Sequence, residues 1–178
     1  MDPVLSRHVA RVRHLRESFA EANERFVARL RRVDDHAAQR VSPEGGWTAA
    51  QIGWHVARVT TRFAGLLSGD LPGVEALPDG FEERDWSSIV ARLPPRLKTS
   101  AAFEPPAKVT RDEAVAALEA SGVRMAQALD AVTIDRGARF GITSPIVGGF
   151  INLYQVGEWA TAHVIRHNRQ AKRVLGEG

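Results

Sequence analysis

The chain has 178 residues, of which 44% are hydrophobic and 25% charged, so its length and composition are typical of one globular domain spanning residues 1–178. It contains no cysteine, which excludes disulfides, iron–sulfur clusters, thiolate metal sites and a cysteine nucleophile. The formal net charge is only +3. Without a recognition helix or interleaved aromatic residues, this charge does not predict a nucleic-acid partner.

The two segments that could be targeting or membrane signals do not fit those roles. The first eight residues, Met1 to His8, are charged and amphipathic, unlike a secretory signal. Residues 140–157 carry no charge but include Pro145, two adjacent glycines and an asparagine, so we expect a buried loop and the start of a helix rather than a membrane span. We therefore expect a cytoplasmic protein without membrane contact.

The first predicted helix covers residues 3–38. Asp2 and Pro3 form a favourable helix start. Apolar residues then recur at seven-residue spacing, with two more on the neighbouring row, which predicts one buried stripe in a bundle: Leu5, Val12, Phe19, Phe26 and Val33, with Val9 and Leu30. The segment from Ser42 to Trp47, with one proline and two glycines, should end the helix in a turn.

A second helix is predicted over residues 48–67, where Thr48 and Gln51 fit a capping box. Residues 69–110 are rich in proline and glycine, and we expect there a long connection with one short helix over residues 85–93.

The third predicted helix starts at Thr110 and Glu113, which again fit a capping box. Its apolar seam contains Gly122, which would allow a close helix approach. A second loop over residues 135–149 leads into a fourth helix over residues 150–175. Because no segment alternates as a strand does, the sequence predicts an all-α four-helix bundle with a long connection between the second and third helices.

Three of the six histidines fall on the predicted core faces. His163 and His167 are four residues apart on the fourth helix, a spacing that suits two metal ligands. His55 lies on the apolar stripe of the second helix. Neutral imidazoles from facing helices can converge on one cation, and the alternative is three separately hydrogen-bonded core histidines. We interpret His8, His14 and His36 as solvated.

This pattern differs from that of zinc metalloproteases, since Val164 stands where their general-base glutamate would be and Glu158 faces away from His163. Three protein ligands would leave an open position on the ion, which is typical of catalytic sites. The ligands alone do not identify the metal, so zinc, nickel, iron and manganese all remain open.

The arrangement resembles the DinB/YfiT-like family of metalloenzymes. The resemblance rests on three segments and spans nearly the whole chain: Gly46 to His55, Thr143 to Gly149, and the pair His163 and His167 followed by Gln170. It implies a four-helix bundle, a divalent metal held by His55, His163 and His167, frequent homodimers, and transfer or isomerisation reactions that depend on a low-molecular-weight thiol. Residues 69–110 depart from the most compact members and could shape a different pocket.

Other residues near the predicted ligands are weaker candidates for the site. Arg58 and Arg62 follow His55 by one and two turns, where they could hold a carboxylate of a thiol or substrate or simply be solvated. Gln170 could orient a metal-bound group or pack at the bundle end. We expect Trp54 and Trp159 to be core residues.

Two classes of function remain open at this stage. The first is a metal-dependent enzyme acting on small molecules, namely a thiol S-transferase or isomerase, with a metal-dependent hydrolase as a variant. The second is a non-catalytic helical bundle that binds a metal or another ligand.

Overall fold

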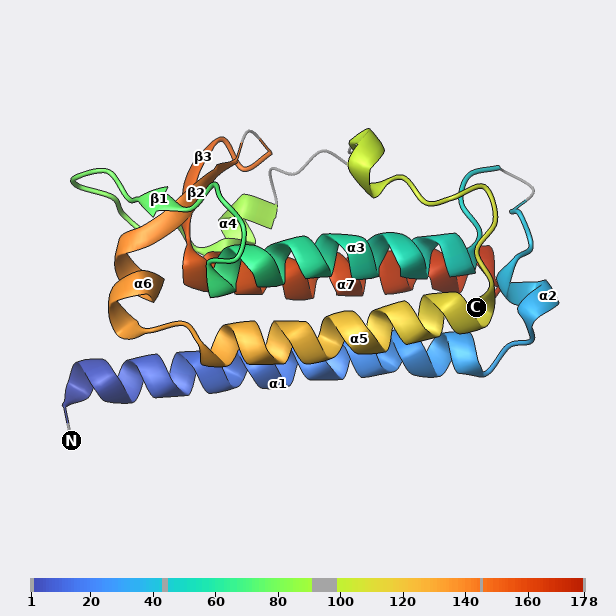
Figure 1. The fold of residues 1–178 in the computed structure, drawn as a ribbon, viewed down its shortest axis with the longest axis horizontal. Coiled ribbons are helices and arrows are strands. Elements are labelled where there is room, and N and C mark those ends of the chain that lie inside the picture. Colours follow the sequence, from blue (N-terminus) through green and yellow to red (C-terminus); the bar gives the residue numbers. More distant parts are fainter. Residues whose placement is uncertain (1, 43–44, 91–98, 145, 178) are drawn as a thin grey trace.

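The computed structural model describes residues 2–42, 45–90, 99–144 and 146–177 of the chain. Figure 1 shows four long helices lying side by side along the longest axis of the molecule: α1 (Pro3–Arg31), α3 (Ala49–Ser68), α5 (Arg111–Asp130) and α7 (Leu153–Val174). Of these four, α3 packs against α5 and α7, and α1 packs against the same two helices. The mainly helical fold predicted from periodicity is confirmed.

The remaining elements of the described residues are short. Helix α2 (Asp35–Ala38) follows α1, and helix α6 (Ile134–Arg139) follows α5. Between α3 and α5 lie strand β1 (Glu75–Ala76), helix α4 (Trp86–Val90) and the 3-10 helix η1 (Ala101–Phe103). Strands β2 (Phe140–Ser144) and β3 (Gly149–Asn152) precede α7.

The sequence predicted no strands, and this prediction is wrong, because the structure contains a small three-stranded sheet. Strand β2 pairs antiparallel with both β1 and β3, with Gly141 opposite Asn152 and Ser144 opposite Gly149. The predicted loop over residues 135–149 is therefore partly α6 and β2. Strands of two to five residues are too short to show an alternating pattern of apolar and polar residues, so periodicity did not predict this sheet.

The helix starts follow the capping chemistry of the sequence. Thr48 with Gln51 and Thr110 with Glu113 form the two predicted capping boxes. A third box, not predicted, joins Asn152 to Gln155, so α7 begins three residues later than expected. Of the short helix predicted over residues 85–93, α4 accounts for residues 86–90, and residues 91–93 lie outside the described part.

The single first helix predicted over residues 3–38 is wrong, because α1 ends at Arg31. Asp34 then caps a separate helix α2, accepting a hydrogen bond from the amide of Ala37 at 2.7 Å. An aspartate side chain that bonds a nearby amide competes with the continuing helix. In the predicted turn that follows, Gly45 and Gly46 both have positive φ, while Pro43 and Glu44 are outside the described residues.

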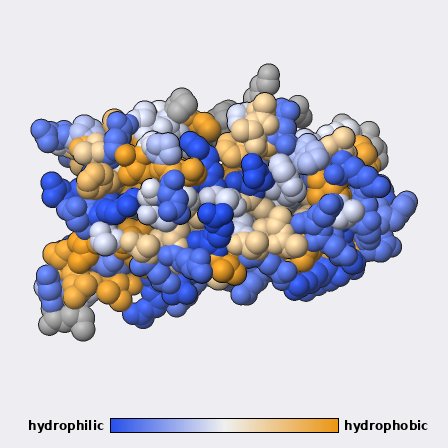
Figure 2. Space-filling model, viewed as in Figure 1, coloured by the Kyte–Doolittle hydropathy of each residue, from blue (hydrophilic) through white to orange (hydrophobic). Residues whose placement is uncertain are grey.

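The core lies between the four long helices. Phe26, Ile52, Leu118 and Met125 are completely buried there. The first turns of α1 extend past the ends of α3 and α5 (Figure 1), so the predicted apolar stripe is not buried along its whole length. Figure 2 shows apolar surface where α1 begins, and the residues Val4, Leu5 and Val9 are 43–48% exposed.

Arg11 of α1 links the segment between α3 and α5 to the first turns of α7. Its guanidinium donates to Glu83 and, at 2.9 Å, to Glu158, and it lies 4.4 Å from the centre of the Tyr154 ring. Burial alone would raise the pKa of Glu83, but the hydrogen bonds from Arg11 and Asn152 outweigh it and lower that pKa. No helix in the described residues is long and apolar enough to span a membrane.

We predict that Gly137→Ala destabilises the protein by about 1–3 kcal/mol, the usual cost of overpacking. A Cβ at Gly137 would lie 2.3 Å from the ring of Tyr154, and the hydroxyl of Tyr154 is held by His8 at 2.7 Å. Helix propensity alone predicts the opposite sign, a gain of up to about 1 kcal/mol. Denaturant unfolding measures the difference.

The control for this prediction is Ala138→Ser at the exposed neighbouring position, which should change the free energy of unfolding by less than about 0.5 kcal/mol. In a Tyr154→Ala background the cost of Gly137→Ala should disappear. A stabilised Gly137→Ala variant would show that Tyr154 moves aside freely.

Candidate metal centre

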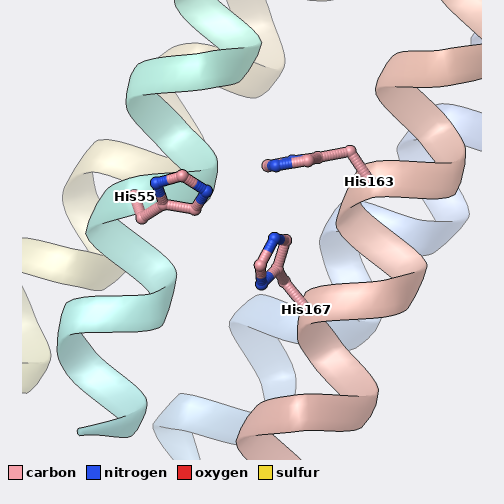
Figure 3. Close-up of side chains that lie close together, drawn as sticks. All are labelled: His55, His163 and His167. Atoms are coloured by element: carbon pink, nitrogen blue, oxygen red, sulfur yellow. The ribbon is translucent and has the colours of Figure 1, made fainter. Parts of the chain in front are cut away.

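Two facing helices position the three histidines. His55 projects from α3, and His163 and His167 project from successive turns of α7 towards it (Figure 3). The capping boxes at Thr48 and Asn152 set where each helix begins, and therefore which face each histidine occupies.

The three imidazoles form one cluster. Ring centroids are 4.4 Å apart for His163 and His167, 4.9 Å for His55 and His167, and 5.2 Å for His55 and His163. One ring nitrogen from each histidine can be chosen so that all three lie within 4.8 Å of one another. Among the histidine, aspartate and glutamate side chains of the described residues, these three histidines form the one group close enough to hold a metal ion. The group contains no carboxylate.

The ring of His55 is fixed by a backbone carbonyl and an aromatic ring. Its Nδ1 donates to the carbonyl oxygen of Phe103 at 2.8 Å, and because a carbonyl can only accept, the neutral ring keeps its lone pair on Nε2. The ring of Trp47 lies 4.8 Å away, centroid to centroid. The segment that contains η1 thus orients the histidine of α3.

His167 has a similar support on its own helix. Its Nδ1 donates to Oε1 of Gln170 at 2.7 Å, which again leaves Nε2 with the lone pair. Of the two roles considered for Gln170, the structure therefore favours orientation, but of a histidine rather than of a bound group.

His163 has a ring nitrogen without a partner. Its Nδ1 is buried and makes no hydrogen bond, although buried polar atoms in native proteins nearly always have one. A nitrogen left in this state costs free energy unless something supplies a partner for it.

Loss of solvation lowers the pKa of all three imidazoles and so favours their neutral form. Burial, followed by the charges of His167, His55 and Arg166, lowers the pKa of His163 well below its usual value. Burial also lowers the pKa of His167 to about 4, reinforced by His55. For His55, burial lowers the pKa although the bond to Phe103 opposes the change. Neutral imidazole is the form that binds a metal ion.

The residues present fit a metal ion. Three nitrogens at about 2.0–2.1 Å from one ion stand about 3.4 Å apart, so small side-chain rotations would bring the cluster to that spacing. Hydrogen bonds that fix the far nitrogens of His55 and His167 are the usual support of metal-bound histidines. A metal ion in the cluster would also supply a partner for one ring nitrogen of His163.

The arginines considered as substrate contacts are not drawn into the cluster. Arg58 is exposed, and its guanidinium lies 5.6 Å from the centre of the Trp54 ring. Arg62 is also exposed. Neither forms a hydrogen bond or an ion pair with the three histidines in the described residues. Trp54 and Trp159 pack against the hydrophobic core, as expected.

Two other expectations have different outcomes. His14 and His36 are exposed as expected, but His8 is half-buried and bonds the hydroxyl of Tyr154, so its interpretation as solvated is wrong. Glu158 is paired with Arg11, and the side chain of Val164 has no group that can accept a proton, so neither residue supplies a general base to the cluster.

Sequence reasoning missed Phe103. It acts through its backbone carbonyl, which carries no residue-specific signal, and it is 48 residues from His55. Trp47 lies within the segment Gly46 to His55 that carries the resemblance, but the contact of its ring with His55 was not predicted.

Comparisons with known proteins find a family model that matches the sequence and a solved structure with a similar fold. A model of the DinB superfamily matches residues 18–171. No curated protein matches the sequence. A solved structure with a similar fold is that of a conserved protein from Enterococcus faecalis, with a TM-score of 0.62, 16% identity, and coverage of 92% of this chain and 94% of that one. At this identity the likeness concerns the fold alone.

We predict that the metal-free protein loses stability as the pH falls from about 6.5 to 4. The unfolded chain protonates its histidines near pH 6.5, whereas His167 in the folded protein does so only at about 4. The unfolded state therefore binds more protons in this window, at a cost of up to about 1.4 kcal/mol per pH unit for each histidine. Denaturant unfolding of chelator-treated protein at successive pH values measures the slope.

His167→Gln should reduce this slope, whereas His14→Gln, at an exposed position, should leave it unchanged. Equal slopes for wild type and His167→Gln would contradict burial of a neutral imidazole at position 167.

Proposed function

The chain belongs to the DinB superfamily, and from this premise we propose that it is a metal-dependent enzyme acting on small molecules. The reaction we propose is S-transfer or isomerisation with a low-molecular-weight thiol. The divalent metal would be held by His55, His163 and His167. We also propose that the four long helices form the four-helix bundle of this superfamily, with residues 69–110 as its long connection and one domain over the whole chain.

The observation that carries the proposal is the cluster of three neutral imidazoles on two facing helices, two of which are oriented by hydrogen bonds. All three donors are nitrogen, and the sequence contains no cysteine. Three protein ligands leave at least one position of a metal ion open to a small molecule. A structural zinc site would instead have a full set of four protein ligands.

A bound divalent metal would lower the pKa of a thiol or water at its open position. The deprotonated group would then be available as a nucleophile near neutral pH. The chain itself would supply binding and orientation. Phe103 and Gln170 hold the rings of His55 and His167 in the tautomer that presents Nε2. The ring of Trp47 packs beside that of His55.

A peptidase is not supported by the arrangement. Such an enzyme needs a general base beside the metal, and the cluster contains no carboxylate. A thiol that reaches the protein as a co-substrate needs only to lose its proton, so this chemistry requires fewer protein groups. A cytoplasmic location and a homodimer remain predictions.

The first test is elemental analysis of the untagged protein beside the His163→Ala/His167→Ala double variant. We expect about one equivalent of metal in the wild type and loss of most of it in the double variant. No metal in the wild type, even after reconstitution with zinc, nickel, iron and manganese, would mean that the histidines are core residues.

The second test concerns catalysis. The metal-loaded protein would be assayed with a panel of thiols and electrophiles, with His55→Ala as the inactive control and circular dichroism to verify its fold. Thiol-dependent turnover in the wild type alone supports the enzyme. No turnover above the His55→Ala variant would favour a non-catalytic metal-binding bundle.

We also predict that Gln170→Leu weakens zinc binding about 10-fold or more, the usual effect of removing a partner that orients a metal-bound histidine. The substitution removes the acceptor for Nδ1 of His167 and leaves the three ligands in place. Competition with a chromogenic zinc chelator measures the affinity.

Gln170→Glu, which keeps an acceptor, should bind zinc at least as well as the wild type. Gln127→Leu, at an exposed position of α5, serves as the matched control. Equal affinities for Gln170→Leu and Gln127→Leu would show that Gln170 does not support the site.

A further inference from the structure

A groove of about 550 Å³ lies between α1 and α7. Its volume is within the usual range for small-molecule sites, about 300–1,000 Å³. Arg25 and Arg29 line it from α1, Arg32 from the residue directly after α1, and Asn168 and Arg169 from α7.

The charge of this groove is unbalanced. Arg25 pairs with Glu21, a lining residue, and Arg29 pairs with Glu177 near the C-terminus. Within the described residues, Arg32 and Arg169 have no acidic partner, and both are exposed. The groove therefore retains two uncompensated positive charges.

Arg29 is held in place before any ligand arrives. Its side chain is only 19% exposed, and its Nε donates to Oδ1 of Asn168 at 2.6 Å, which joins the two helices. Burial lowers the pKa of Arg29, and the charge of Arg32 lowers it further. The cationic groups of the groove thus repel one another, and an anion between them would relieve that repulsion.

The chemistry of the lining residues indicates the ligand. Guanidinium groups bind phosphate and carboxylate oxygens through paired hydrogen bonds. The hydroxyl group of Ser18 offers a further hydrogen bond, and Ile165 gives the groove an apolar wall. A small organic anion with two or more charged groups would match both features.

We propose that this groove binds a small multiply charged anion, carrying phosphate or carboxylate groups, through Arg29, Arg32 and Arg169. The site is separate from the histidine cluster. His163 and His167 face α3 (Figure 3), whereas Thr161, Ile165 and Asn168 lie on the side of α7 that meets α1.

The test is isothermal titration of the metal-stripped full-length protein with two probes, pyrophosphate and propane-1,2,3-tricarboxylate, at constant ionic strength in chloride. We expect saturable one-to-one binding of at least one probe, and the comparison of the two identifies phosphate or carboxylate as the preferred group. Binding to neither probe would overturn the proposal.

Arg32→Gln/Arg169→Gln should weaken binding at least 10-fold. Arg13→Gln/Arg40→Gln removes the same charge from exposed positions outside the groove and should weaken it less than threefold. Equal weakening in both double variants would indicate a general charge effect and overturn the site. Melting temperatures would verify that both variants fold.

Arg29→Lys gives an additional readout, because lysine keeps the charge but loses the fork that reaches Asn168. We expect a reduced affinity in this variant. Unchanged affinity in Arg29→Lys would contradict the role of a fixed guanidinium. Since all measurements use metal-stripped protein, their outcome is independent of the proposed metal chemistry.

Discussion

The site depends on three imidazoles that meet between α3 and α7, with His55 buried and His163 and His167 half-buried. Each ring has two nitrogens, and a buried nitrogen without a partner is costly. Phe103 and Gln170 satisfy one nitrogen each on His55 and His167, while Nδ1 of His163 has no partner. One nitrogen of each ring lies within 4.8 Å of a nitrogen of the other two, so a single cation can bind all three rings.

The connection between α3 and α5 supports this arrangement from two sides. Near its end, Phe103 bonds His55 of α3. Nearer its start, Glu83 bonds Arg11 of α1 and Asn152 at the cap of α7, so it helps to fix the helix that carries the other two histidines. The connection is therefore part of the scaffold of the site, and changes within it reach both helices.

Long-range packing decides what the sequence could and could not predict. The four long helices and the residues of the cluster follow from apolar periodicity, from the caps at Thr48 and Thr110 and from the spacing of the histidines, all of which are local signals. The strands escaped detection because each has at most five residues. The contact of Phe103 with His55 escaped because it depends on how a proline-rich segment folds back, and His8 because its partner Tyr154 is 146 residues away.

The composition of the cluster also restricts the kind of metal that it suits. No carboxylate belongs to it, so binding must come from donation by nitrogen lone pairs rather than from opposite charge. Imidazole suits zinc, nickel and iron, whereas magnesium and calcium need oxygen ligands. Manganese also favours oxygen, which makes it the weakest match of the four metals that the sequence left open.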